Sequence, residues 1–171
     1  MMFYIDTNVI LSYTFTNEAN HLSAVNAING IKSKGKFYIS SLVVSELYCN
    51  IVRNISKYAL PYSGFRNLAV EVKARIIIEY AMRTIGIDLQ PDDGMLERLW
   101  LGEMAFWAFS DSIDLDAEIG LRTGDAIHLA YANKLKKNGL VQYIVSLDKD
   151  FGNKRNEIRM KTGIEILPNT A

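Results

Sequence analysis

The sequence lacks the cysteines that a disulfide framework or a thiolate metal cluster would need. Cys49 is the only cysteine in 171 residues, so it has no partner within its own chain. The two histidines, His21 and His128, follow no zinc-binding pattern. A zinc centre is therefore not expected.

A long apolar run is also missing. No stretch approaches the roughly eighteen residues that a membrane span requires, and the segment from Met1 to Ile10 has no positive charge before its apolar residues, as a secretory signal would. We expect a soluble cytoplasmic protein with no membrane contact. With 171 residues, 49% of them hydrophobic, the chain is long enough for one core and short for two. Residues 1–171 are predicted to form a single domain.

An excess of charge of one sign is absent as well. The formal net charge is zero, which taken alone argues against a nucleic-acid-binding protein. The charges are unevenly spread, however. Residues 86–125 carry ten acidic and two basic side chains, and the rest of the chain carries nine acidic and seventeen basic ones. This distribution permits a basic rim around an acidic centre.

Short β-branched or aromatic runs alternate with longer stretches of helical period. The predicted strands are 2–5, 37–40, 85–89, 143–147 and 164–167. The predicted helices are 9–15, 18–34, 42–54, 66–83, 93–109, 116–121 and 125–137. Because parallel strands need crossover connections that are usually helical, we predict an α/β fold, a three-layer α/β/α sandwich with a central, mainly parallel five-stranded sheet. A break from Pro61 to Gly64 predicts a helical arm at about 42–83, with its tip near Pro61.

Two acidic residues directly follow predicted strands. Asp6 comes after the strand at 2–5, and Asp148 comes after the strand at 143–147. In open parallel sheets, ligands bind beyond the carboxyl ends of the strands, where loops present functional groups. Both carboxylates are therefore candidates for one site at this edge of the sheet.

Two further acidic residues lie near the starts of apolar helices. Glu46 is about one turn into the helix predicted at 42–54, where an unpaired carboxylate is costly to bury. Asp125 opens the helix at 125–137, where its charge suits the positive helix end. Ordinary alternatives exist, since Asp6 and Asp125 can be helix N-caps and Glu46 can pair with a distant arginine. Because all four acids lie at strand ends or helix starts, we favour the interpretation that they form one site over separate capping or pairing roles.

Four grouped carboxylates raise one another's pKa and call for a cation. Carboxylates and water are the ligands that Mg²⁺ and Mn²⁺ prefer. The predicted metal ligands are Asp6, Glu46, Asp125 and Asp148. Phosphoryl chemistry is the function that such a site implies.

Four segments occur in order along nearly the whole chain. They are Ile5-Asp6-Thr7-Asn8 after the first strand, Glu46 on the helix after the second, Leu121 to Ala130 around Asp125, and Ser146 to Phe151 around Asp148. Together they resemble the PIN-domain ribonucleases, particularly the toxins of VapBC-type toxin–antitoxin pairs. Many such toxins are shorter, and the excess here lies mostly in the helical arm and in residues 92–116.

The resemblance implies a Mg²⁺- or Mn²⁺-dependent endoribonuclease whose catalytic and metal-binding residues are the four acids named above. It also implies that Thr7 or Asn8 orients a water on the metal, that Ser146 hydrogen-bonds near the site, and that Asp150 is an accessory acid. Cleavage would leave a 5′-phosphate and a 3′-hydroxyl, with one or two metals. An antitoxin partner and a homodimer are further implications.

Single-stranded RNA would be held by basic residues on its phosphates. The candidates that we favour are Lys36, Arg53, Lys149 and Arg155, with Lys32, Lys34, Lys57 and Lys154 as further ones. Such charges are more often solvated surface. His128, three residues after Asp125, is interpreted as a histidine satisfied by local hydrogen bonds. The aromatic cluster from Trp100 to Phe109 is expected to pack against the core or a dimer mate.

Two other functions compete with the nuclease. Haloacid-dehalogenase-like phosphatases use an aspartyl nucleophile after the first strand, but they carry a second Asp two positions later, where this chain has Asn8. The other alternative is a catalytically silent PIN-like RNA-binding or scaffolding module. Such a module has no need of all four acids, so their presence favours the enzyme.

Overall fold

A central parallel sheet organises the chain in the computed structural model, which describes residues 1–60 and 67–168. The strands of this sheet, in spatial order, are β3 (Ile87–Leu89), β2 (Lys36–Ile39), β1 (Met2–Ile5), β6 (Tyr143–Val145) and β7 (Glu165–Leu167). Every pair of neighbours in it is parallel. The predicted five-stranded parallel sheet is confirmed. Its strands are the buried apolar runs of the sequence, and helices form the crossover connections between them.

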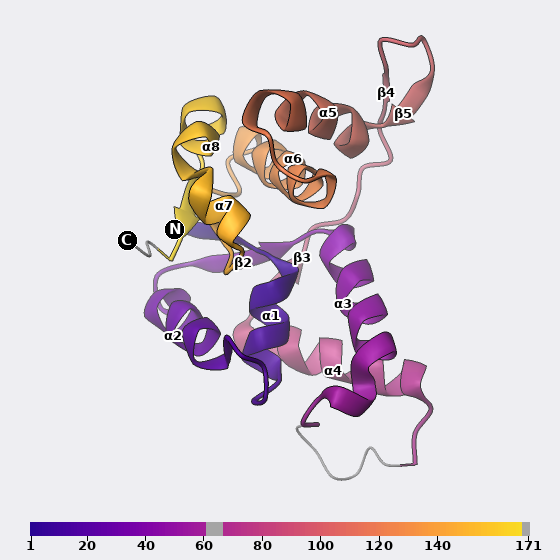
Figure 1. The fold of residues 1–171 in the computed structure, drawn as a ribbon, viewed down its shortest axis with the longest axis vertical. Helices are drawn as coiled ribbons and strands as arrows, with labels where there is room; N and C mark the ends of the chain where they lie inside the picture. The colour runs from indigo at the N-terminus through magenta and orange to yellow at the C-terminus, as the bar shows by residue number, and fades with distance from the viewer. Residues whose placement is uncertain (61–66, 169–171) are drawn as a thin grey trace.

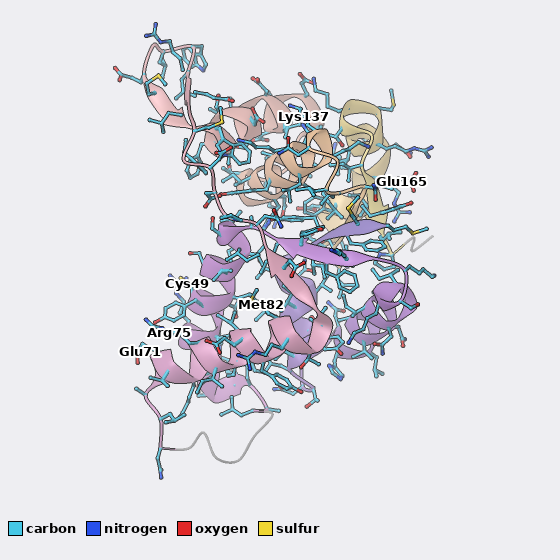
Figure 2. The ribbon with its side chains drawn as sticks, turned by 180° about the vertical axis from the view of Figure 1, so that it is seen from behind. Cys49, Glu71, Arg75, Met82, Lys137 and Glu165 are labelled. Carbon is cyan, nitrogen blue, oxygen red and sulfur yellow. The ribbon has the colours of Figure 1, made fainter. Side chains whose placement is uncertain are left out.

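Helices cover both faces of the sheet (Figures 1 and 2). One layer contains α1 (Thr7–Thr14), α2 (His21–Lys32), α3 (Ser41–Asn54), the short η1 (Ile55–Lys57) and α4 (Val70–Ile85). The other layer contains α5 (Trp107–Ile119), α6 (Thr123–Lys137), α7 (Lys149–Asn153) and α8 (Arg155–Thr162). This arrangement is the predicted three-layer α/β/α sandwich. No helix in the described ranges is long and apolar enough to cross a membrane.

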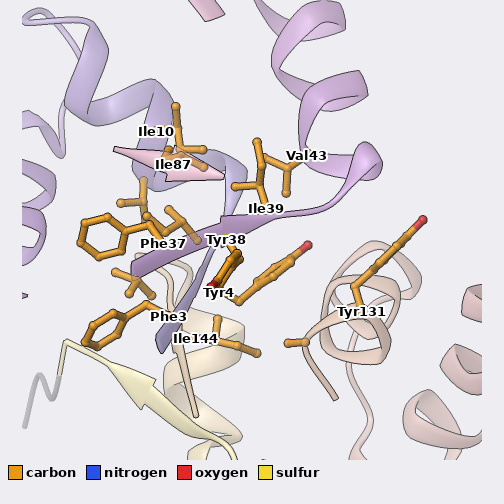
Figure 3. Close-up of a cluster of buried hydrophobic side chains, with 14 of the residues drawn as sticks. Phe3, Tyr4, Ile10, Phe37, Tyr38, Ile39, Val43, Ile87, Tyr131 and Ile144 are labelled. Atoms are coloured by element: carbon orange, nitrogen blue, oxygen red, sulfur yellow. The ribbon is translucent and has the colours of Figure 1, made fainter. Parts of the chain in front are cut away.

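The core lies on the sheet, where aromatic and β-branched side chains from neighbouring strands meet (Figure 3). The ring of Phe3 on β1 lies 5.6 Å from that of Phe37 on β2 and 5.3 Å from that of Tyr143 on β6. Fully burying a side chain of this size contributes about 1.5–3 kcal/mol. The sheet is therefore a rigid platform for the loops that leave its carboxyl edge.

The segment after β3 differs from the prediction. The helix expected at 93–109 is wrong, because β4 (Leu96–Arg98) and β5 (Met104–Phe106) form an antiparallel hairpin there. Gly102 at the hairpin turn has a φ of +91°, a conformation that a helix does not contain. The helix expected at 116–121 is the last part of α5, which ends where Gly120 adopts a φ of +73°.

The predicted helical arm corresponds to α3 and α4, which pack against each other. Both helices also contribute to the core, since Leu47 of α3 and Ile77 of α4 are each 1% exposed. The predicted tip near Pro61 lies outside the described residues.

Candidate active site

All four predicted acids line one hollow at the carboxyl edge of the sheet. Asp6 follows β1, Glu46 lies in α3, Asp125 lies in the first turn of α6, and Asp148 follows β6. The hollow, which we call the acidic cleft, has a volume of about 430 Å³. Because β1 and β6 are parallel neighbours, their ends bring Asp6 and Asp148 to the same edge, although the two residues are far apart in sequence.

Asp6 is held in place by its own loop and by the end of β6. Its backbone nitrogen donates to the carbonyl of Val145 at 3.0 Å. Its Oδ2 accepts hydrogen bonds from Ser146 Oγ at 2.6 Å and Asn8 Nδ2 at 2.9 Å. The residue is only 5% exposed. Burial raises the pKa of Asp6 above its ordinary value, although His128 and Ser146 act in the opposite direction.

Glu46 is bonded from two sides. Thr7 Oγ1 donates to Glu46 Oε2 at 2.5 Å, and His128 Nε2 lies 3.0 Å from the same oxygen. Burial acts to raise the pKa of Glu46, but the hydrogen bond and positive charge of His128, together with the Thr7 bond, outweigh it. The pKa of Glu46 is therefore lowered, and the side chain is a carboxylate at neutral pH.

His128 is part of this site, and its interpretation as a histidine with local hydrogen bonds is wrong. Its Nε2 contacts Glu46 and lies 3.7 Å from Asp6 Oδ1, and its Nδ1 lies 2.9 Å from the hydroxyl of Tyr4. These partners come from α3, from β1 and from the residue that follows β1. Burial acts to lower the pKa of His128, but Glu46, Asp6 and Asp125 raise it above its ordinary value. The sequence held one indication of this role, because a residue three positions after Asp125 lies on the same face of the helix as Asp125.

Asp125 and Asp148 complete the cleft. The pKa of Asp125 is raised to about 6, first by burial and then by the negative charges of Asp148 and Asp6, while His128 opposes the shift. Asp148 caps α7, because its Oδ1 accepts from the Asp150 nitrogen at 2.8 Å. Asp125 and Asp148 line the same cleft as Asp6 and Glu46.

We predict that Asp125→Asn stabilises the metal-free protein above pH 6. The folded-state pKa is raised, so the folded carboxyl binds a proton more tightly than the unfolded one, and its ionisation costs stability as pH rises from about 4 to about 6. Because solvent screens this half-buried group, we expect the ionised carboxylate to lower the free energy of unfolding by only about 1–2 kcal/mol. Thermal unfolding in EDTA should show a rise of a few degrees at pH 8 that shrinks progressively from pH 6 to pH 4.

The matched control is Asp88→Asn, which removes an exposed carboxylate on the edge strand β3, outside the cleft. A lower melting temperature for Asp125→Asn at pH 8 would show that Asp125 serves to cap or stabilise α6 instead.

The supporting residues contact the acids directly. Thr7 and Asn8 donate to Glu46 and Asp6, so in this structure they hold carboxylates. Ser146 donates to Asp6 and accepts from the Asp148 nitrogen at 3.0 Å, which links the two acids.

The other predicted residues are more scattered. Asp150 pairs with Arg122 at 3.1 Å. Arg53 lines the acidic cleft, and Lys149 and Arg155 line a neighbouring pocket. Lys36 begins β2 and therefore lies at the opposite edge of the sheet, so the structure does not bring it to the site.

The donor chemistry of the cleft fits a hard divalent cation, since it offers carboxylate oxygens and no thiolate cluster. In residues 1–60 and 67–168, however, no three His, Cys, Asp or Glu side chains are arranged to hold a metal ion. Asp6, Glu46 and Asp148 each accept a hydrogen bond from a protein donor in this structure.

Comparison with known proteins places this site in a family. A model of the PIN domain matches residues 3–157. Among solved structures, the chain is similar to VapBC2 from Rickettsia felis bound to a DNA fragment from its promoter, at 13% identity and a TM-score of 0.55, with 97% of each chain covered. It is also similar to VapC20 from Mycobacterium tuberculosis, a sarcin-ricin loop cleaving toxin, at 14% identity and a TM-score of 0.55, covering 88% of this chain and 93% of that one.

At these identities, the two structures support a shared fold. A comparison with curated proteins finds no match. The family model covers most of the chain and includes all four acids of the cleft. The chain therefore belongs to the PIN-domain family.

Proposed function

We propose that the chain is a ribonuclease that hydrolyses phosphodiester bonds in RNA with the help of Mg²⁺ or Mn²⁺. The observation that carries this proposal is the convergence of Asp6, Glu46, Asp125 and Asp148 on one cleft. Such a group of carboxylates is costly without a cation. The four acids would be the metal ligands and the catalytic residues.

The cation, when bound, supplies Lewis-acid stabilisation of the phosphate charge and lowers the pKa of an attacking water. The chain's own residues prepare the site for it. Ser146 and Asn8 fix the orientation of Asp6, and Thr7 fixes that of Glu46. These bonds reduce the conformational entropy that the ligands would otherwise lose on binding. No side-chain nucleophile is required by this chemistry.

Cys49 offers a direct test of cation binding. It is exposed on the wall of the acidic cleft, three residues after Glu46 in α3, and it is the only cysteine of the chain (Figure 2). A nitroxide attached to Cys49 should lose most of its electron paramagnetic resonance amplitude on addition of Mn²⁺, because a bound paramagnetic ion broadens a nearby spin. The loss should saturate, and Mg²⁺ should reverse it.

Two controls accompany this experiment. Asp125→Asn should weaken the Mn²⁺ effect strongly, since it removes a ligand charge. A nitroxide on Met160→Cys in a Cys49→Ser chain, placed on the exposed face of α8, should lose little amplitude. Equal broadening at both positions would indicate that Mn²⁺ acts only from bulk solution.

Cleavage of single-stranded RNA in Mg²⁺ or Mn²⁺, and its absence in EDTA, is the direct assay of activity. A specific observation keeps a second function in view, namely that three of the four acids already accept hydrogen bonds from the protein. A catalytically silent RNA-binding or scaffolding module would bind RNA without cutting it in either buffer.

We further propose that the enzyme is the toxin of a toxin–antitoxin pair and acts in the cytoplasm. Support comes from the fold that it shares with VapC20 and with the VapBC2 complex. A homodimer is proposed because large apolar side chains are exposed on the β4–β5 hairpin and α5, among them Trp100 at 82% and Phe109 at 53%. Co-purification with the product of an adjacent reading frame, and the mass in solution, test these two statements.

A further inference from the structure

A second pocket adjoins the acidic cleft at Asp148, which lies on the wall of both. It has a volume of about 220 Å³ and is lined by residues that follow β6, by Arg155 at the start of α8, and by Ile166 of β7. We call it the Lys149–Arg155 pocket, after its two cationic side chains. A polymer bound across the cleft would reach this pocket directly.

The two cations of the pocket are not paired with any carboxylate of the described residues. Within the described residues, neither Lys149 nor Arg155 forms an ion pair. Lys149 is exposed, and Arg155 is half-buried. One guanidinium nitrogen of Arg155 donates to the Pro168 carbonyl at 3.0 Å, whereas its Nε is buried and has no acceptor among residues 1–60 and 67–168. A half-buried positive charge without a counter-ion is costly, and an anion would offset that cost.

The remaining wall has space and little opposing charge. Asp148 is the only carboxylate among the described residues that line the pocket, and its Oδ1 accepts a hydrogen bond from the Asp150 nitrogen. A Cβ added to Gly152 would meet no atom within 4 Å, so this side of the pocket is open. Two cations and one carboxylate leave this wall with a net positive charge, which suits a phosphate group, because phosphate accepts from guanidinium and ammonium donors.

We propose that the Lys149–Arg155 pocket binds a backbone phosphate of RNA adjacent to the phosphate that is cut. This inference rests on the proposed ribonuclease function. It identifies the surface that the RNA strand contacts where it extends beyond the acidic cleft. The four acids repel an RNA backbone, so affinity must come from cations that lie beside them. The pocket supplies two of those cations next to Asp148.

Arg53 supplies a second contact for the same strand. It lines the acidic cleft from the last turn of α3, and it has no ion pair in the part of the chain that is described. In Figure 1, α3 and α7 lie on different sides of the first turn of α1. A strand held by Arg53 and by the pocket would pass its middle phosphate over the acids. Such a path requires an extended backbone, which single-stranded RNA adopts readily.

Binding of a short fluorescein-labelled single-stranded RNA of random sequence tests the pocket. Fluorescence anisotropy in Mg²⁺ is measured in an Asp125→Asn background, so that the RNA is not consumed. Lys149→Ala with Arg155→Ala should raise Kd about tenfold at ~0.1 M salt and reduce the slope of log Kd against log[salt] by about 0.7, since the pocket holds one phosphate and each phosphate contact contributes about 0.7. Lys36→Ala, at the opposite edge of the sheet, should change neither quantity.

A second pair of variants guards against loss of folding. Gly152→Glu places a carboxylate at the open side of the pocket, and Gly152→Gln places a neutral side chain of nearly the same size there. The Glu variant should weaken RNA binding several-fold more than the Gln variant, with equal melting temperatures. Equal binding by the two, or an unchanged salt slope in the Lys149→Ala and Arg155→Ala chain, would overturn the phosphate pocket.

The outcomes separate this inference from the proposed function. RNA cleavage with an unaltered salt slope would leave the ribonuclease and remove the pocket. RNA binding with the expected slope change, but without cleavage in Mg²⁺ or Mn²⁺, would leave the pocket and remove the ribonuclease. Full displacement of RNA by inorganic phosphate, with no effect of Arg53→Ala on RNA binding, would assign the pocket to free phosphate and overturn the strand proposal.

Discussion

Replacement of Asp6 by Asn should slow metal-dependent RNA cleavage about a thousandfold, equivalent to ~4 kcal/mol of transition-state stabilisation. The Asn carbonyl can keep the bonds that Ser146 and Asn8 donate to Oδ2. Its amide nitrogen then takes the place of Oδ1, the oxygen that faces His128. An amide nitrogen cannot bind a cation, so a ligand is lost while the local geometry is kept.

Initial cleavage rates in Mn²⁺, measured beside melting temperatures, check this expectation. Asp88→Asn on the exposed edge strand should retain the parent rate, because it removes the same charge outside the cleft. Full activity of Asp6→Asn would show that this carboxylate is no metal ligand and that the acidic cleft is not the catalytic centre.

The sequence predicted the sheet and the acids because both depend on local patterns. A strand in the middle of a parallel sheet is covered on both faces, so its sequence is a continuous apolar run without alternating polar residues. Met2 to Ile5 is such a run. The residues that follow such runs must appear at the carboxyl edge, so the positions of Asp6 and Asp148 follow from strand order alone. Glu46 and Asp125 were found in the same way, from helix starts.

The features that the sequence did not predict depend on long-range contacts. The β4–β5 hairpin was taken for a helix because its apolar residues, such as Leu96 and Met104, also match a helical period. Lys36 was a candidate for RNA binding, but a position at the start of a strand places it at the wrong edge. His128 has partners 82 and 124 residues away, and no local pattern reveals them.

Replacement of His128 by Ala should destabilise the metal-free protein by about 3 kcal/mol. His128 is 3% exposed, and it is the cationic or hydrogen-bonding partner that Asp6 and Glu46 share. Removing one member of a buried charged group leaves the others without compensation, which typically costs about 3–5 kcal/mol, and Tyr4 also loses one of its two hydroxyl contacts. The melting temperature in EDTA should fall by roughly 6–12 °C.

A divalent cation should recover part of this loss, because it compensates the same carboxylates from the cleft side. Saturating Mn²⁺ should therefore raise the melting temperature of His128→Ala more than that of the parent. His128→Gln is the matched control, since its amide can still donate to Glu46 but carries no charge, and its loss should be intermediate. If Mn²⁺ stabilises His128→Ala no more than the parent, the histidine and the cation do not serve the same carboxylates. The acids would then be held together by the fold alone.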